Sequence, residues 1–277
     1  MTVAHAAIFA EARRPAGGRS RARRVETAMF VPFLDDAPHR HIGRPWVTYA
    51  FMGVSIAIFV VFQSGLVIDA RQASVVSFGL IPSVLFGEAV LPAGYERVPA
   101  WATLVTSIVL HGGWLHLIGN MMFLWVFGDN VEDDLGRARY LLFLVLCGVG
   151  SGLAHAAGAS NADAPLVGGS GVVAGVVAAY VMLHPQVKVW VLVFYRVPLR
   201  LRAFWIIGAW VVFQAGNALL AGEGAQIAWW AHVGGFLTGG ALVVALKRRD
   251  VHLFDRGLAE RIERRRQPAP TLEERSA

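Results

Sequence analysis

A serine and a histidine, each with glycine neighbours, are the residues of this chain best suited to chemistry. Ser170 lies in the Gly-Gly-Ser-Gly run 168–171 and His232 in the Ala-His-Val-Gly-Gly run 231–235, both within long apolar stretches. Polar groups at membrane depth cost several kcal/mol unless they are satisfied, and ionisable ones there are functional candidates by default. A hydroxyl and an imidazole on two separate helices suggest a nucleophile and its general base. The pair therefore indicates a serine hydrolase that works inside a bilayer.

Small residues surround both side chains at helical spacing. Gly171 and Gly175 lie on a strip beside Ser170, while Gly235 and Gly239 share one helix face with His232. Such strips let helix backbones approach closely in membranes, so we expect these two helices to pack together. For Ser170 taken alone the alternative stays open, because a serine in a glycine-rich packing face is also common in transporters and channels.

A third set of polar residues lies at the start of another predicted helix. His116 and Asn120 are four residues apart and point the same way. As hydrogen-bond donors near a nucleophile they could stabilise an oxyanion, each by about 3–4 kcal/mol. His111 could cap a helix or lie at the membrane interface, and we assign it no catalytic role. A zinc site of His111, His116 and His232 is an alternative with three nitrogens, but the chain shows no HExxH motif or added carboxylate ligand.

The predicted chemistry is that of a Ser–His dyad. No Asp or Glu lies within the predicted spans around Ser170 and His232, so no carboxylate is expected to orient the imidazole. His232 would remove the Ser170 proton and then protonate the leaving amine, and water would hydrolyse the acyl-enzyme. No metal or organic cofactor is needed for these steps. Because water must reach Ser170, we expect the site to open to the extracytoplasmic side.

The elements that must position these residues are membrane helices. The 277-residue chain is 56% hydrophobic and 16% charged, and its apolar residues come in long blocks. Six segments are near the ~20 residues that cross a bilayer: 46–66, 113–130, 139–158, 168–184, 203–221 and 228–247. The segments 113–130 and 168–184 are short and polar for lipid-facing helices, so we expect both inside the bundle.

Basic residues set the predicted orientation. Arginines and lysines crowd the N-terminal segment, the connection between spans four and five, and the tail from Lys247, whereas the opposite side carries only Arg71 and Arg97. The positive-inside rule then places both termini in the cytoplasm. The net charge of +6 is interpreted as anchoring to anionic membrane lipids, with no nucleic-acid partner.

The rest of the chain is organised around one domain, 29–247. Residues 1–28 are rich in Arg, Ala and Gly and are predicted to be disordered, with Met29 as an alternative start. Residues 248–277 form a basic cytoplasmic tail. No cleavable signal peptide is expected, because no early apolar core precedes a cleavage site. Cys147 is predicted to be a small buried packing residue, and 75–86 an interfacial or partly re-entrant segment.

Together these motifs resemble the rhomboid family of intramembrane serine proteases. The family pattern H-x4-H-x3-N, then G-x-S-G, then A-H-x-x-G is present in order at His111, His116, Asn120, Gly168, Ser170, Gly171, Ala231, His232 and Gly235. The resemblance implies an all-α bundle of six transmembrane helices over about 29–247. Ser170 would be the nucleophile, His232 the base, and His116 and Asn120 the oxyanion partners.

The resemblance also implies partners and location. The substrates would be transmembrane segments of other membrane proteins, with small residues before the scissile bond. Residues 128–136 resemble the family's loop between spans two and three, where Glu132 would be a structural hydrogen-bonding residue. The segment after Met29 resembles the start of many bacterial members, which implies a multi-pass protein of the bacterial inner membrane.

Two positions depart from the family pattern. A Trp-Arg pair of the first long loop is replaced by Ala102-Thr103, so the anchoring of that loop is expected to differ. An aromatic residue four positions after the serine is replaced by Ala174, so another side chain must support the base histidine. The alternative functions are a non-proteolytic rhomboid-like binder of transmembrane clients, which usually lacks the serine or histidine, and a transporter or channel, which does not explain three motifs in order.

Overall fold

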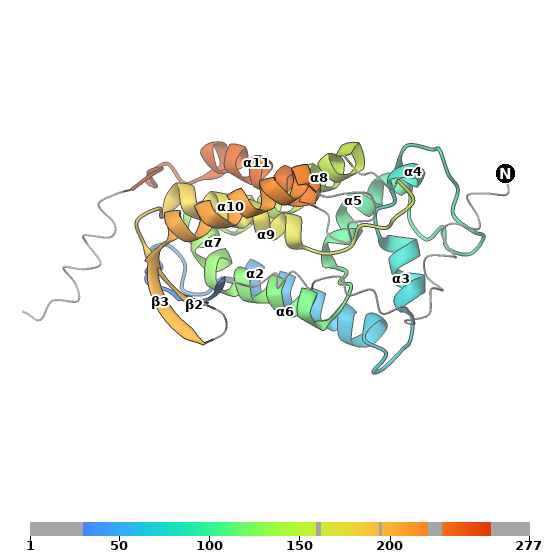
Figure 1. Ribbon diagram of the computed structural model, residues 1–277, viewed down its shortest axis with the longest axis horizontal. Helices are drawn as coiled ribbons and strands as arrows, with labels where there is room; N and C mark the ends of the chain where they lie inside the picture. Colours follow the sequence, from blue (N-terminus) through green and yellow to red (C-terminus); the bar gives the residue numbers. More distant parts are fainter. Residues whose placement is uncertain (1–29, 159–161, 194–195, 221–228, 256–277) are drawn as a thin grey trace, which may run out of the picture.

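The computed structural model describes residues 30–158, 162–193, 196–220 and 229–255. The predictions of a disordered segment 1–28, of a start at Met29 and of most of the tail 248–277 lie outside these residues. The described chain is mostly helical. Helices α8, α10 and α11 lie along one side, α2 and α6 lie along the other, and α9 runs between them (Figure 1).

Each of the six predicted segments contains a long helix. Their bounds are α2 (Trp46–Ile58) with its π-helical continuation (Phe59–Gln63), α6 (Trp114–Phe123) with a π-helical turn (Leu124–Gly128) and α7 (Asp129–Leu135), α8 (Arg137–Gly158), α9 (Ser170–Leu183), α10 (Ala203–Leu220) and α11 (Trp229–Leu246). The first helical segment ends three residues earlier than predicted, and the second continues past residue 130 to Leu135.

Several of these helices could cross a membrane. By length and apolar composition, three described helices qualify: Trp46–Gln63, Arg137–Gly158 and Trp229–Leu246. A fourth candidate is the pair Ala100–Val109 and Trp114–Leu135, which is bent by 81°. With 14 residues, α9 spans only about 21 Å, less than a hydrocarbon core. The chain thus carries three to four candidate spans, and six crossings remain a prediction.

The two segments expected inside the bundle differ in their surroundings. Helix α9 is central, since every residue from Gly171 to Tyr180 is buried. The segment 113–130 is divided: Leu124, Val126 and Phe127 are buried as expected, whereas on α6 Leu115 is 87% exposed and Ile118 55% exposed. Its polar residues follow one face and its large apolar residues another, which is the pattern of a helix at the edge of a bundle.

Glycines bring α9 and α11 into backbone contact, as their spacing predicted. A Cβ atom added at Gly235 would lie 1.9 Å from the carbonyl oxygen of Gly171, and one at Gly239 would lie 2.3 Å from that of Gly175. A Cβ atom at Gly175 would also lie 2.5 Å from the Cys147 sulfur of α8, and that cysteine is buried as predicted. The two helices can approach only because these positions carry no side chain.

The Gly235→Ala variant is expected to lose about 1–3 kcal/mol of stability, because its methyl group would push α11 away from α9. The matched control is Gly240→Ala on the same helix, where the nearest atom would be the Met182 sulfur at 3.5 Å. Alanine there should be neutral or stabilising through its better helix propensity. Thermal unfolding in detergent measures both changes, and equal midpoints for the two variants would contradict the packing argument.

The long connection before α6 is folded rather than extended. It contains α3 (Arg71–Phe78), α4 (Pro82–Leu85), a 3-10 turn (Ala100–Ala102), α5 (Thr103–Thr106) and a second 3-10 turn (Ser107–Val109). Leu80 and Leu166 exchange both backbone hydrogen bonds, at 3.0 and 2.7 Å. This connection therefore holds the segment that leads into Ser170.

A small sheet corrects the prediction of an all-α fold. Strand β1 (Phe30–Asp35) pairs with β2 (Lys188–Val193), which pairs with β3 (Val197–Arg202), all antiparallel. The sheet lies at the end of the bundle away from the start of α9 (Figure 1). Val189 and Val191 of β2 are fully buried. Alternating β-branched residues with one buried face favour a strand, and this pattern was hidden in a segment interpreted as a connection.

Glu132 joins α7 to the start of α2. Its carboxylate accepts hydrogen bonds from the backbone N–H groups of Val47 and Thr48, at 3.0 and 2.8 Å, and from the Thr48 hydroxyl at 2.9 Å. The residue is fully buried. Two of the three donors are the unpaired N–H groups of a helix N-terminus, so Glu132 caps α2 from a distance. It is the structural hydrogen-bonding residue that the resemblance implied.

Asp35 fastens the sheet to the helices. Its Oδ2 atom accepts a 2.6 Å hydrogen bond from the Tyr180 hydroxyl of α9 and a 2.9 Å bond from the Asn130 amide of α7. The pKa of this carboxyl is raised to about 8, chiefly by burial and also by the nearby Asp129 and Asp36 carboxylates, while the Tyr180 hydrogen bond opposes the rise. Asp35 is therefore protonated in the folded protein at neutral pH.

This protonation predicts a pH-dependent stability. An unfolded Asp has a pKa near 3.8, so between about pH 4 and pH 8 the folded state binds the proton that the unfolded state has lost. The stabilisation is complete below pH 4, falls progressively as the pH rises from 4 to 8, and is fully lost once the pH has passed 8. Asn is a neutral isostere of the protonated acid, so Asp35→Asn should remove this loss. Unfolding midpoints at pH 5–9 check it: parallel profiles for wild type and variant would contradict the assignment.

Candidate active site

Ser170 and His232 lie in direct contact. The hydroxyl of Ser170, the first residue of α9, lies 2.9 Å from Nε2 of His232 on α11, so it can donate to a neutral imidazole. The contact follows from the glycine packing, because Gly235 lies one turn beyond His232 and touches Gly171. The two residues are 62 positions apart in the chain, and the sequence predicted their pairing from those glycines.

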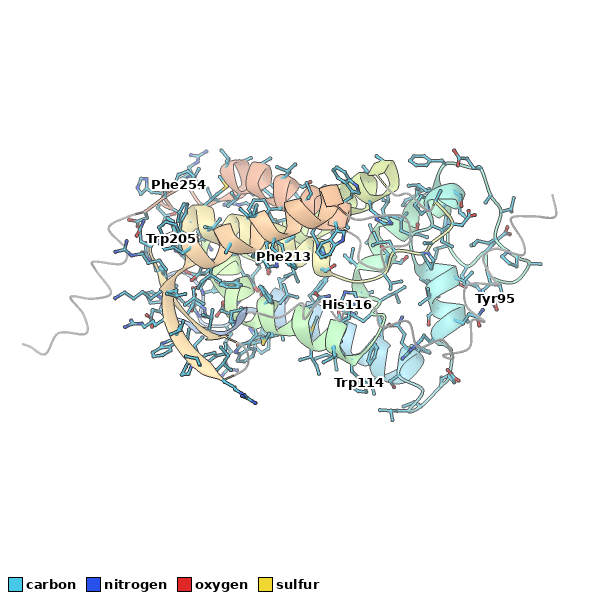
Figure 2. All side chains as sticks on the ribbon, in the orientation of Figure 1. Tyr95, Trp114, His116, Trp205, Phe213 and Phe254 are labelled. Atoms are coloured by element: carbon cyan, nitrogen blue, oxygen red, sulfur yellow. The ribbon has the colours of Figure 1, made fainter. Side chains whose placement is uncertain are left out.

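The backbone just before Ser170 is shaped around His116. Gly168 has a φ of +121°, a conformation that L side chains rarely adopt. A Cβ atom at Gly168 would lie 2.4 Å from Cε1 and 2.7 Å from Nε2 of His116. The Nε2 edge of this ring therefore lies against the backbone two residues before Ser170. Figure 2 shows His116 on α6, in the middle of the molecule between that helix and the layer above it.

Helix α9 also contributes backbone donors. At the start of this helix, the Val173 N–H donates a hydrogen bond to the carbonyl of Gly169, the residue just before the helix, at 2.8 Å. The N–H groups of Ser170 and Gly171 precede that bond and lie at the positive end of the helix. An oxyanion formed on a carbonyl attacked by Ser170 would lie close to these groups.

Asn120 is buried and held by His111. The Asn120 amide donates to Nε2 of His111 at 3.1 Å, and the His111 Nδ1–H points to the Val109 carbonyl at 3.3 Å. His111 is fully buried, and its backbone N–H donates to the buried Gln63 side chain at 3.0 Å. Sequence reasoning missed Gln63, because one amide at the end of an apolar helix gave no signal.

Two aromatic rings, from α10 and α11, lie beside the base histidine. The Trp210 and Trp229 rings lie 6.3 and 6.1 Å from the His232 ring, centre to centre. Trp229 is three residues before His232 on α11, but nothing in the sequence pointed to Trp210 on α10. Nδ1 of His232 is buried and makes no hydrogen bond among the described residues.

The zinc alternative finds no support in the geometry. Nε2 of His232 faces a hydroxyl and Nε2 of His111 faces an amide. Within the described ranges, the histidine and acidic side chains that come close enough to share a metal ion are His41, Asp133 and Asp134, which belong to a different part of the molecule.

Comparison with known proteins gives the same family as the motifs. The Rhomboid domain family matches residues 98–249. Rhomboid-like protein 11, chloroplastic, of Arabidopsis thaliana is 36% identical over 89 residues, which are 32% of this chain and 31% of that protein. Rhomboid protease GluP of Bacillus subtilis (strain 168) is 30% identical over 129 residues, 43% of this chain and 23% of that protein.

A second protein of Bacillus subtilis (strain 168), putative rhomboid protease YdcA, is 36% identical over 87 residues, 30% of this chain and 41% of that protein. Each alignment covers less than half of the relative. The Rhomboid match is longer, since it spans more than half of this chain and contains all three motifs. This protein belongs to the rhomboid family.

Proposed function

We propose that this protein is a serine-type intramembrane endopeptidase that hydrolyses peptide bonds in or near transmembrane segments of other membrane proteins. The observation that carries the proposal is the 2.9 Å contact between the Ser170 hydroxyl and His232 Nε2. A serine is a weak nucleophile unless a base lies within hydrogen-bond reach, and this contact meets that requirement. Relatives that are named rhomboid proteases support it.

The reaction follows from the neighbours of Ser170. His232 Nε2 takes the hydroxyl proton as Oγ attacks the carbonyl carbon of the substrate. The oxyanion receives hydrogen bonds from the Ser170 backbone N–H, His116 and the second N–H of the Asn120 amide, whose first N–H is bound to His111. His232 then protonates the leaving amine, and water hydrolyses the acyl-enzyme by the same proton route in reverse.

The proposed setting is a six-span bundle in a bacterial inner membrane with both termini in the cytoplasm. In this topology Ser170 begins α9 on the extracytoplasmic side, where water can enter. Substrates are single-span helices with small or helix-breaking residues near the cleaved bond, because a stable helix hides its carbonyl groups from attack. Membrane lipids are the other partner.

Labelling of the detergent-purified protein with a fluorophosphonate probe tests the proposal. Wild type should be labelled and Ser170→Ala should not, because the probe reacts only with an activated serine. Equal labelling of both would mean that Ser170 is not the reactive group. A folded wild type that neither reacts nor cleaves a transmembrane substrate in liposomes would favour a non-proteolytic binder of transmembrane clients.

A further inference from the structure

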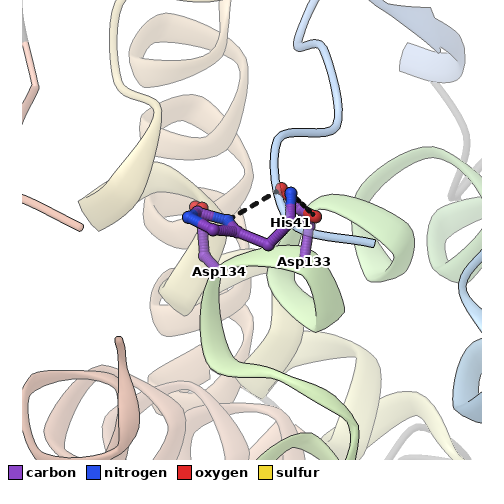
Figure 3. A group of neighbouring side chains, drawn as sticks. All are labelled: His41, Asp133 and Asp134. Atoms are coloured by element: carbon purple, nitrogen blue, oxygen red, sulfur yellow. Dashed lines mark hydrogen bonds and ion pairs between the residues drawn. The ribbon is translucent and has the colours of Figure 1, made fainter. Parts of the chain in front are cut away.

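Two histidines and two aspartates gather at the end of the bundle opposite Ser170. His41 precedes α2, Asp133 and Asp134 belong to α7, and His184 follows the last residue of α9. One side-chain oxygen or nitrogen from each of His41, Asp133 and Asp134 lies within 4.8 Å of the others (Figure 3). Nε2 of His184 is 2.8 Å from Oδ2 of Asp134. We call these four residues the α7 cluster.

His41 has a carboxylate at each ring nitrogen. Its Nε2 atom is 2.8 Å from Asp250 Oδ2, and its Nδ1 atom is 3.3 Å from Asp133 Oδ2. A neutral imidazole carries one proton, so one nitrogen would direct its lone pair at a carboxylate. That arrangement is repulsive, so either the ring is protonated and donates to both carboxylates, or a cation lies between the two atoms. If Asp250 takes the Nε2 proton, the cation belongs at Nδ1.

The second histidine has a contact that is close but misaligned. His184 and Asp134 are 7% and 3% exposed, and their facing atoms are 2.8 Å apart. Neither atom makes a hydrogen bond of acceptable angle, and Nδ1 of His184 also has no hydrogen bond among the described residues. Two buried donor atoms about 3 Å apart that do not point at each other are arranged like two ligands of one metal ion.

Outer contacts hold the cluster in place. The Asp133 carboxylate accepts hydrogen bonds from the backbone N–H groups of Arg40, His41 and Ile42, at 2.7, 2.8 and 2.7 Å. Asp250 fixes the far nitrogen of His41. Metal-bound carboxylates and imidazoles are usually oriented in this way by a second ring of hydrogen bonds. Arg248, which is close by, donates to the Asp133 backbone carbonyl.

We propose that the α7 cluster binds one divalent transition-metal ion of the zinc type through His41 Nδ1, Asp133 and Asp134, with His184 Nε2, which lies beside Asp134, turning in as the fourth ligand. Two imidazoles with two carboxylates suit zinc or cobalt, whereas magnesium and calcium prefer oxygen ligands alone. The ion would fasten the segment before α2, helix α7 and the end of α9. Its role is structural, and it does not depend on the proposed protease activity.

Cobalt binding tests the site. The full chain is purified in detergent, its tag is removed, and it is treated with a chelator before cobalt is added. Visible d–d absorption and elemental analysis should give one ion per chain, displaced by zinc. Asp134→Asn and His184→Gln each remove a direct ligand, so each should weaken binding by more than the roughly 10- to 100-fold typical of an outer-shell partner. The matched control is His252→Gln, an exposed histidine two residues after Asp250, which should bind like wild type.

A second measurement does not depend on variants. Zinc in excess should raise the unfolding midpoint of wild type by several degrees and leave that of His184→Gln unchanged, because the ion binds only the folded state. Gel filtration and helical circular dichroism establish that each variant is folded. The proposal is wrong if wild type shows no saturable binding of one ion, or if His252→Gln loses cobalt as fully as His184→Gln.

Discussion

Replacement of His232 by alanine is expected to lower peptide-bond hydrolysis by about 10⁴-fold or more. The reason is geometric, because Nε2 of His232 is the group that contacts the Ser170 hydroxyl, at 2.9 Å. Without that nitrogen the serine keeps its proton and the leaving amine receives none. Initial rates for a transmembrane substrate in liposomes measure the loss, and fluorophosphonate labelling should disappear with it.

The double variant makes this prediction sharper. If Ser170 and His232 act as one unit, the Ser170→Ala/His232→Ala protein should be no slower than either single variant. His252→Gln is the control for loss of an imidazole away from the site, and it should retain full activity. A His232→Ala protein that keeps more than a tenth of wild-type activity would show that another group removes the proton.

The sequence predicted those contacts that depend on helical spacing. Gly171 and Gly235 lie at positions that allow two helices to approach closely, so Ser170 and His232 could be paired from the sequence alone. Cys147 was predicted to be buried because it is a lone small residue in the middle of an apolar span, and it lies against Gly175. These predictions needed only the period of a helix, the size of a side chain and its place in an apolar span.

Contacts that depend on the tertiary fold could not be predicted in this way. Strand β1 pairs with β2 more than 150 residues later, and no local pattern joins Phe30 to Val193. Trp210 reaches His232 from a different helix, and the contact between His111 and Asn120 requires the turn before α6. These contacts form between elements that are far apart in the sequence, so the spacing of residues within one element does not predict them.

Asn120→Ala is expected to lower kcat by about 10²- to 10³-fold with little change in KM. The Asn120 side chain is buried and one of its N–H groups is bound to His111 at 3.1 Å, which fixes the direction of the second. Such a fixed donor stabilises charge that exists only in the transition state, so its loss should leave substrate binding intact. His116→Ala should show the same division between kcat and KM.

Two further variants separate this role from a structural one. Ile118→Ala removes an exposed side chain from the same helix, so it should change neither constant.

His111→Phe keeps a ring but cannot accept the Asn120 hydrogen bond. Asn120 then loses its fixed orientation, and kcat should fall, though less than in Asn120→Ala. An Asn120→Ala protein with a raised KM and unchanged kcat would mean that the amide binds substrate rather than the oxyanion. The kcat of His111→Phe thus measures how much of the donor's effect comes from its orientation.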